Sequence, residues 1–483
     1  MKQILIIFLL VGSLYPNNLK SRNFGCVKAP GLNDRKQSHI SNIGSFTIVQ
    51  SRELSRQPKS DFSSCLGIFA SPPLMKLRHI YLTWQEDPCR TMTITVHGIE
   101  TPTELTLYYD TAPHHSKLDA YSKQCISQGA HKLKLPDKRL IYHFQLKDLQ
   151  PNTPYYFTIG NKTHCFGSEH SFKTIAQDPP YLFVEGGDWE NTPAATKLAQ
   201  MAATYSPDAI LLGGDYPSGV FGSKEFAKWD EWLDVYCRTM VTKEGHLIPM
   251  VMAIGNHEVV GGFGQPKKQA PFFYDYFCQG NTAKSYFSLP FGSYVRLFVL
   301  DSGHVERHDG EQLTWLASEL EAYQDCPIKI ALYHVPLFPS IRFVEKGFAY
   351  RTICRMLSLT GIESPEIRLF SHASLAGQTH WLPLFDQYNL TVAFEHHDQT
   401  LKRTKLLRAG KPHPQGTLYL GDGGWGAILQ YPPIQGYFNK YFDKLQGKQQ
   451  FFWLVNIEQD QITYSAISQT GNCLDKNNQK ISH

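Results

Sequence analysis

Four common functional signatures are missing from this sequence, and each absence argues against a class of protein. The ten cysteines contain no CxxC pair, so zinc-finger-type sites are not indicated. The net charge is only +4, and no cluster of lysine and arginine with interleaved aromatic residues suggests a nucleic-acid partner. Beyond the N-terminus no segment approaches membrane-spanning length, and no glycine loop of the Walker type is present to cradle a phosphate.

The N-terminus has the pattern of a secretory signal. Met1-Lys2 precede a short apolar run at residues 4–14, which is too short to span a bilayer comfortably. We therefore expect a signal peptide at residues 1–20 and a secreted, periplasmic or cell-envelope protein. Residues 21–71 are polar with little periodicity and predict a poorly ordered leader. Export also makes disulfides plausible, although the cysteine spacing does not determine which residues pair.

The composition is that of a globular protein with 42% hydrophobic residues, and 483 residues suffice for two or three domains. The segment 72–176 reads as the first of them. Alternating or aromatic-rich runs lie at 79–85, 91–98, 103–110, 140–149 and 154–160. Short strands at this spacing predict a β-sandwich of about 100 residues. Residues 146–160 resemble the later strands of fibronectin type III modules, and a positioning role is expected because no catalytic cluster is present.

From residue 177 strands alternate with helical patterns, which we expect at 192–205, 223–240 and 310–323. Five short apolar runs here end in Asp, Asn or His. The runs 181–184, 210–212, 251–254, 328–333 and 392–394 lead to Asp188, Asp215, Asn256, His334 and residues 395–398. One such ending is usually a turn residue or a helix cap. Because ligands bind at the carboxyl ends of strands in α/β sheets, five endings favour a shared metal cluster.

Taken in order, these motifs resemble those of the calcineurin-like metallophosphoesterases, and more narrowly the purple acid phosphatases and their bacterial relatives. The motifs are GGD at 186–188 and 213–215, GNHE at 255–258, YHVP at 333–336, FEHHDQTLKRT at 394–404 and YLGDGGWG at 419–426. The likeness covers roughly residues 72–470 and implies a mixed α+β architecture. In it a fibronectin type III-like β-sandwich precedes a four-layer αββα metallophosphoesterase domain over 177–470, and residues 471–483 form a tail.

The resemblance also implies a dinuclear centre of Fe, Mn or Zn, and the departures described below make one or two ions per chain the expectation. Asp215 would bridge two ions, while Asn256, His334 and His397 would complete one position and Asp188 would belong to the other. Two such ions clamp a phosphate and supply a metal-bound hydroxide.

Two further histidines are candidate catalytic residues. His257 is expected just outside the ions, where an imidazole can steady the phosphate or protonate the leaving oxygen. His304 follows a predicted strand at 295–300, and a cleft-facing role and an ordinary loop position are about equally supported. Substrate specificity is expected to come from loops such as 261–271 and 340–347.

Two departures from the family pattern fall on the Asp188 position. The family's GDxxY tyrosine is replaced by Ser218, and the second histidine of its GHxHxYxR motif is replaced by Gln399. Both are weak oxygen donors at best and should lower the affinity for a transition metal. His396 is expected to point away along its strand, although a shift of one residue would let it substitute for the lost ligand.

These residues and the resemblance together predict an exported, acid phosphatase-like phosphoesterase with one weakened metal site. Its expected partner is a small phosphorylated substrate. Nucleic acid and, after signal removal, a transmembrane segment are not expected, and the oligomeric state is left open. The alternative is a catalytically decayed protein of the same fold that acts as a phosphate- or partner-binding surface module.

Overall fold

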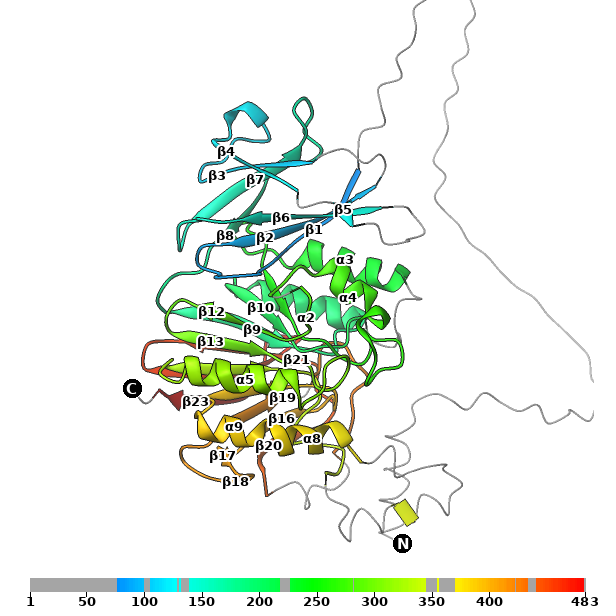
Figure 1. Cartoon of the computed structure of the whole chain (residues 1–483), viewed down its shortest axis with the longest axis vertical. Helices are drawn as coiled ribbons and strands as arrows, with labels where there is room; N and C mark the ends of the chain where they lie inside the picture. The colour runs from blue at the N-terminus through cyan, green and yellow to red at the C-terminus, as the bar shows by residue number, and fades with distance from the viewer. Residues whose placement is uncertain are drawn as a thin grey trace, which may run out of the picture. The chain divides into compact units, whose positions relative to one another are not determined.

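The computed structural model describes residues 76–99, 105–127, 130–131, 139–217, 226–280, 282–344, 354–355, 370–421, 423–432 and 440–481 (Figure 1). The predicted signal peptide at 1–20, the predicted leader at 21–71 and Ser218 therefore lie outside the described residues. Within the described residues, no helix combines the length and the apolar character that a membrane crossing requires.

The first described part is the predicted β-sandwich. One antiparallel sheet has the order β1 (Lys76–Thr83), β2 (Met92–Ile99), β6 (Leu140–Leu146), β5 (Ala130–His131); the other has β4 (Lys123–Ile126), β3 (Thr106–Asp110), β7 (Pro154–Gly160), β8 (His170–Lys173). A 3-10 turn, η1 (Leu118–Ala120), precedes β4. Alternate residues such as Ile94, Phe144, Leu107 and Phe157 are buried in one core, because successive side chains of a strand point to opposite faces.

Two further sheets form the centre of the second part. The six-stranded sheet has the order β11 (Met250–Met252), β10 (Ala209–Leu212), β9 (Tyr181–Gly186), β21 (Phe451–Ile457), β22 (Gln461–Ser468), β23 (Cys473–Lys480). The seven-stranded sheet has the order β12 (Phe287–Phe291), β13 (Val295–Val299), β14 (Ile328–Leu332), β15 (Val392–Glu395), β19 (Leu418–Gly421), β16 (Leu401–Thr404), β20 (Phe442–Gln446). A small hairpin, β17 (Leu407–Arg408) and β18 (Lys411–Pro412), lies between β16 and β19 in the sequence.

Three hydrophobic cores separate four layers in this part. Phe183 and Leu211 of one sheet share a core with Leu297 and Ile330 of the other. The helices α2 (Pro193–Ala203), α3 (Phe226–Thr239) and α4 (Pro271–Tyr276) cover the outer face of the six-stranded sheet, and α5 (Glu311–Ala322), α8 (His372–His380) and α9 (Leu382–Gln387) lie by the seven-stranded sheet (Figure 1). A 3-10 turn, η2 (Lys267–Gln269), precedes α4. The predicted αββα arrangement is therefore confirmed.

The predicted tail at 471–483 is wrong over most of its length. Cys473–Lys480 forms β23, which pairs antiparallel with β22 at the edge of the six-stranded sheet. Its residues are mostly polar and partly exposed, so the strand lacks the apolar alternation from which sequence reasoning recognises a strand. Polar side chains are typical of an edge strand, because they discourage pairing with another chain.

Disulfides do not form among most of the described cysteines. Cys89, Cys125, Cys165, Cys237, Cys278, Cys326 and Cys473 are free thiols. Burial raises the pKa of the Cys237 thiol to about 12, which keeps it protonated and unreactive.

A buried polar network joins the first sandwich sheet to α3 and α4. His79 Nε2 lies 2.9 Å from Asp234 Oδ1 of α3. His97 Nε2 donates to the Tyr81 hydroxyl at 3.0 Å, and that hydroxyl donates to the Tyr276 carbonyl at 2.8 Å. Burial lowers the pKa of His79, despite the charge of Asp234, and lowers the pKa of His97 well below its usual value.

Acidification is therefore expected to destabilise the fold through these histidines. Because their folded pKa values are lowered, the unfolded chain binds more protons once the pH falls below about 6.5. Their contribution is complete above that pH and declines as the pH falls through it. We expect the wild-type melting temperature to drop on acidification, and His97→Gln to make that slope shallower. Exposed His164→Gln is the control that should leave the slope unchanged; an identical slope in His97→Gln would refute the assignment.

Candidate metal centre

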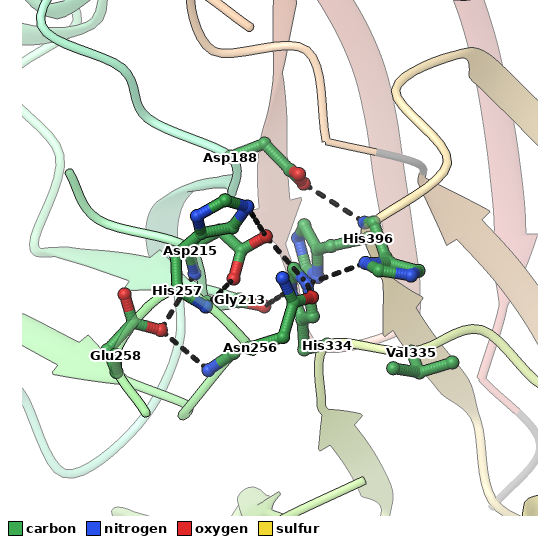
Figure 2. Close-up of polar contacts among 12 residues, drawn as sticks. Asp188, Gly213, Asp215, Asn256, His257, Glu258, His334, Val335 and His396 are labelled. Atoms are coloured by element: carbon green, nitrogen blue, oxygen red, sulfur yellow. Dashed lines mark hydrogen bonds and ion pairs between the residues drawn. The ribbon is translucent and has the colours of Figure 1, made fainter. Parts of the chain in front are cut away.

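The polar residues predicted at strand ends are brought to one edge of the two central sheets. β9, β10 and β11 are parallel, and β14 and β15 are parallel in the facing sheet. The loops after these five strands carry Asp188, Asp215, Asn256, His334 and His397. Figure 2 shows four of them, together with His257, gathered at the ends of the strands.

His334 lies at the middle of this cluster. Its Nε2 is 3.1 Å from Asp215 Oδ2, 3.2 Å from Asn256 Oδ1 and 3.1 Å from His397 Nδ1 (Figure 2). Asp215, His334 and His397 each offer one ligand atom, and these atoms lie within 4.8 Å of one another. Two imidazole nitrogens, a carboxylate oxygen and an amide oxygen thus surround one point.

This donor set fits a metal cation of the kind the sequence predicts. His334 Nδ1 donates to the Gly213 carbonyl at 2.9 Å, so in the neutral ring Nε2 turns its lone pair toward the other donors. Burial alone would lower the pKa of His334, but the Asp215 carboxylate raises it to about 9. Burial would raise the pKa of Asp215, but the charges of His257 and His334 hold it well below its usual range. The cluster therefore favours positive charge here, which suits Fe, Mn or Zn.

Backbone strain is concentrated at the same place. Asp188, Asp215, His397 and Gln399 have φ of 53°, 62°, 76° and 55°. Residues other than glycine adopt this left-handed region at a cost, and such residues cluster where a site requires a particular side-chain direction. Tertiary hydrogen bonds stabilise this backbone conformation. Asp188 N donates to the Gly214 carbonyl at 2.9 Å, and His397 N donates to Asp188 Oδ2 at 3.0 Å.

Glu258 fixes the loop after β11 against the loop after β10, a role that sequence reasoning missed. Its carboxylate accepts from the backbone N–H groups of Gly255 at 2.6 Å, Asp215 at 2.9 Å and Tyr216 at 2.6 Å (Figure 2). Burial, with a contribution from the charge of Asp215, raises the pKa of Glu258 to about 8. The GNHE motif was the available signal, but two of the three partners of its Glu, Asp215 and Tyr216, are 43 and 42 positions upstream.

Among the described residues, the Asp188 side of the cluster offers fewer metal-ligand atoms than the His334 side. Gln399 Nε2 donates to Asp188 Oδ1 at 3.1 Å, while Oδ2 accepts from His397 N. The Gln399 amide therefore presents hydrogen-bond donors to Asp188. Tyr216 does not reach this side: its buried hydroxyl accepts from Gly214 N and donates to the Ala253 carbonyl at 3.3 Å.

His396 points into the core, as expected from strand alternation. Its Nδ1 donates to the Tyr333 carbonyl at 3.0 Å, and its Nε2 lies 2.6 Å from Glu185 Oε1, so neither nitrogen is directed to the cluster. The ring packs against Gly187 and Gly213, where an added Cβ would meet it at 2.4 Å and 1.8 Å. A larger residue at Gly187 or Gly213 of the two GGD motifs would therefore clash with the His396 ring.

His257 and His304 differ in their contacts and in their exposure. His257 N donates to Asp215 Oδ1 at 2.8 Å, its Nε2 is 3.6 Å from Asp215 Oδ2, and its side chain is 16% exposed. His304 is fully buried, with Nδ1 donating to the Gly262 carbonyl at 2.9 Å and Nε2 3.2 Å from Ser302 Oγ. Burial lowers the pKa of His304 to about 4. His257 is therefore partly open to solvent, whereas His304 is enclosed by the protein, with its ring centroid 5.6 Å from that of His334.

Comparisons with known proteins agree with this geometry. The family model for the purple acid phosphatase N-terminal domain matches residues 77–174, and the model for calcineurin-like phosphoesterases matches residues 163–372. Purple acid phosphatase 18 of Arabidopsis thaliana is 22% identical over 300 residues, covering 59% of this chain and 58% of the relative. Purple acid phosphatase 1 of Ipomoea batatas is 26% identical over 233 residues, covering 44% and 46%. The chain thus spans about half the length of these curated relatives.

Solved structures show the same fold. Purple acid phosphatase PPD1 from yellow lupin (Lupinus luteus) superposes with a TM-score of 0.64 at 16% identity, over 83% of this chain and 74% of that one. The structure of PhoD gives 0.60 at 10% identity, over 86% and 94%. The fold is that of the calcineurin-like phosphoesterases, and the two matched models together span residues 77–372. With the N-terminal domain that precedes the phosphoesterase domain, this chain is similar to the purple acid phosphatases.

Proposed function

We propose that this chain is an exported, metal-dependent phosphoesterase that hydrolyses phosphomonoesters at a centre with one intact and one weakened metal position. The observation that carries the proposal is the convergence of Asp215, Asn256 and His397 on His334 Nε2. The apolar run at residues 4–14 supports export. The β-sandwich, predicted at 72–176, positions the catalytic domain that follows.

In this proposal the chain's residues have distinct roles. Asp215, Asn256, His334 and His397 would hold a metal ion, which would supply Lewis-acid polarisation of phosphoryl oxygens and activation of water. Asp215 remains ionised because His257 and His334 hold its pKa low, so it can bind the cation. His257, which is open to solvent beside Asp215, steadies the phosphoryl group or protonates the leaving oxygen. Glu258 keeps the two loops in place through its three backbone hydrogen bonds.

The test is hydrolysis of phenyl phosphate by the metal-loaded chain against a metal-only blank. Turnover above the blank that Asn256→Ala abolishes supports the proposal. Metal and phosphate binding without turnover would instead support the alternative, a decayed protein that binds phosphate or a partner. The Gln399 amide on Asp188 is the observation that favours this alternative.

The weakened position is proposed at Asp188, where Gln399 offers N–H donors to the carboxylate and the resemblance assigns Ser218 to the lost tyrosine. Ser218→Tyr combined with Gln399→His is expected to raise the metal content toward about two ions per chain. With ferric iron this variant should also become visibly coloured, as a phenolate ligand implies. Elemental analysis and an absorption spectrum measure both effects.

A matched control replaces the same side chains without adding ligands, as in Ser218→Phe combined with Gln399→Leu. This control should gain neither metal nor colour. If the restored variant binds no more metal than the wild type, Ser218 and Gln399 do not occupy the ligand positions.

A further inference from the structure

An exposed aromatic ring stands directly beside the candidate metal centre. Phe263 is 43% exposed, and its ring centroid lies 4.7 Å from that of His304 and 6.3 Å from that of His397. Its plane is tilted by 34° to the first and by 84° to the second, so a ring edge meets His397. The phenyl group is therefore next to a proposed metal ligand and still open to solvent.

The segment that carries Phe263 is fixed against the neighbouring loop on both sides of the ring. Gly264 N donates to the Gly303 carbonyl and Gln265 N to the His304 carbonyl, each at 2.9 Å. Before the ring, the Gly262 carbonyl accepts from His304 Nδ1 at 2.9 Å. A fixed apolar ring that leaves much of its surface in water gains little from burial, so fold stability does not account for its position.

A second loop with exposed apolar residues approaches the Asp188 side of the centre. The loop 423–432 approaches Asp188 at Gly423, and Gln430 N donates to the Gln399 carbonyl at 3.2 Å. The same loop carries Ile428 and Tyr431, which are 51% and 48% exposed. Two loops that carry exposed apolar side chains thus border the polar residues that would hold a phosphoryl group. A leaving group with apolar faces fits such a border.

We propose that Phe263 selects substrates whose leaving group carries a planar aromatic ring, which stacks on its exposed face. The inference rests on the proposed phosphoesterase function and names its substrate class. An aryl phosphate and a nucleotide share this chemistry: the first places the ring on the ester oxygen, and the second places it beyond a ribose. Aromatic stacking of this kind changes affinity by about two- to tenfold.

The kinetic test compares phenyl phosphate, adenosine 5′-monophosphate and glycerol 2-phosphate, which has no ring. Phe263→Ala is expected to lower the kcat/KM of a ring-bearing substrate relative to glycerol 2-phosphate by about two- to tenfold, through KM. Phe263→Tyr should restore the ratio. Tyr323→Ala, at an exposed aromatic residue after α5, is the matched control and should leave the ratio unchanged. If only phenyl phosphate loses kcat/KM in Phe263→Ala, the substrate class is the aryl phosphates. If only adenosine 5′-monophosphate does, it is the nucleotides.

A binding test separates this inference from the proposed activity. Phenylphosphonate and methylphosphonate cannot be hydrolysed, and calorimetry on the metal-loaded chain compares them. The wild type should bind phenylphosphonate more tightly, and Phe263→Ala should lose that preference. If hydrolysis stays at the blank while the preference is present, the activity is refuted and the aromatic contact is supported. If the wild type shows no preference in either assay, or keeps it in Phe263→Ala, the inference is overturned whatever the activity.

Discussion

Replacing His334 by alanine is expected to release the metal and to reduce phosphomonoester hydrolysis to the level of a metal-only blank. His334 Nε2 is the atom on which Asp215, Asn256 and His397 converge, so its loss removes a ligand and the centre of the arrangement. A bound metal supplies several kcal/mol of transition-state stabilisation, and each ~1.4 kcal/mol is tenfold in rate. The loss in kcat/KM should therefore be on the order of 10³-fold or more.

Steady-state hydrolysis and metal content measured on the same sample check this result. The fold should persist, because the ring is deleted at a loop beyond the end of β14 and the cores between the layers are untouched. His246→Ala is a suitable control. This half-buried histidine precedes β11 in the sequence and is hydrogen-bonded to Ser171, so its loss should leave the metal content unchanged. A His334→Ala protein with wild-type metal content and turnover would show that the centre lies elsewhere.

Replacing Lys402 by methionine is expected to cause a large loss of stability. Lys402 Nζ lies 2.7 Å from Glu395 Oε2, and both side chains are fully buried. Glu395 Oε1 also accepts from the Tyr333 hydroxyl at 2.7 Å and from Leu337 N at 2.6 Å. Removing one member of a buried ion pair leaves an uncompensated charge, which costs about 3–5 kcal/mol. Glu395 ends the strand that leads to His397, so metal affinity should fall as well.

Denaturant unfolding measures the loss, and two further variants define its origin. Lys402→Met combined with Glu395→Gln removes both charges and should recover much of the lost free energy. Lys147→Met breaks an exposed pair with Glu86 and should change stability by about 1 kcal/mol or less. If Lys402→Met unfolds at the same denaturant concentration as the wild type, the buried ion pair does not contribute to the free energy of unfolding as proposed.

The sequence predicted the strand ends of the centre because they depend on local pattern. An apolar run that stops at glycine before Asp, Asn or His describes β9, β10 and β11 without any tertiary information. The two-sheet arrangement was implied by the resemblance to the calcineurin-like metallophosphoesterases that these motifs carry. The predicted strands were therefore confirmed where neighbouring residues in the chain determine the conformation.

Contacts between distant parts of the chain could not be predicted in the same way. The Glu258 carboxylate binds the loop at 215–216, and His396 pairs with Glu185 across the two sheets. The Lys402–Glu395 pair also depends on tertiary structure, since a lysine in a strand usually indicates a solvated face. β23 was missed because its stability comes from backbone pairing with β22, which leaves little trace in its side chains.

The central claim is that Asp215, Asn256, His334 and His397 together hold a metal ion. Elemental analysis of metals per chain tests it most directly, on protein purified without chelators and then exposed to Fe, Mn and Zn in turn. We expect about one tightly bound ion per wild-type chain, since one position has its full donor set. Wild-type protein that retains none of the three metals would contradict the claim.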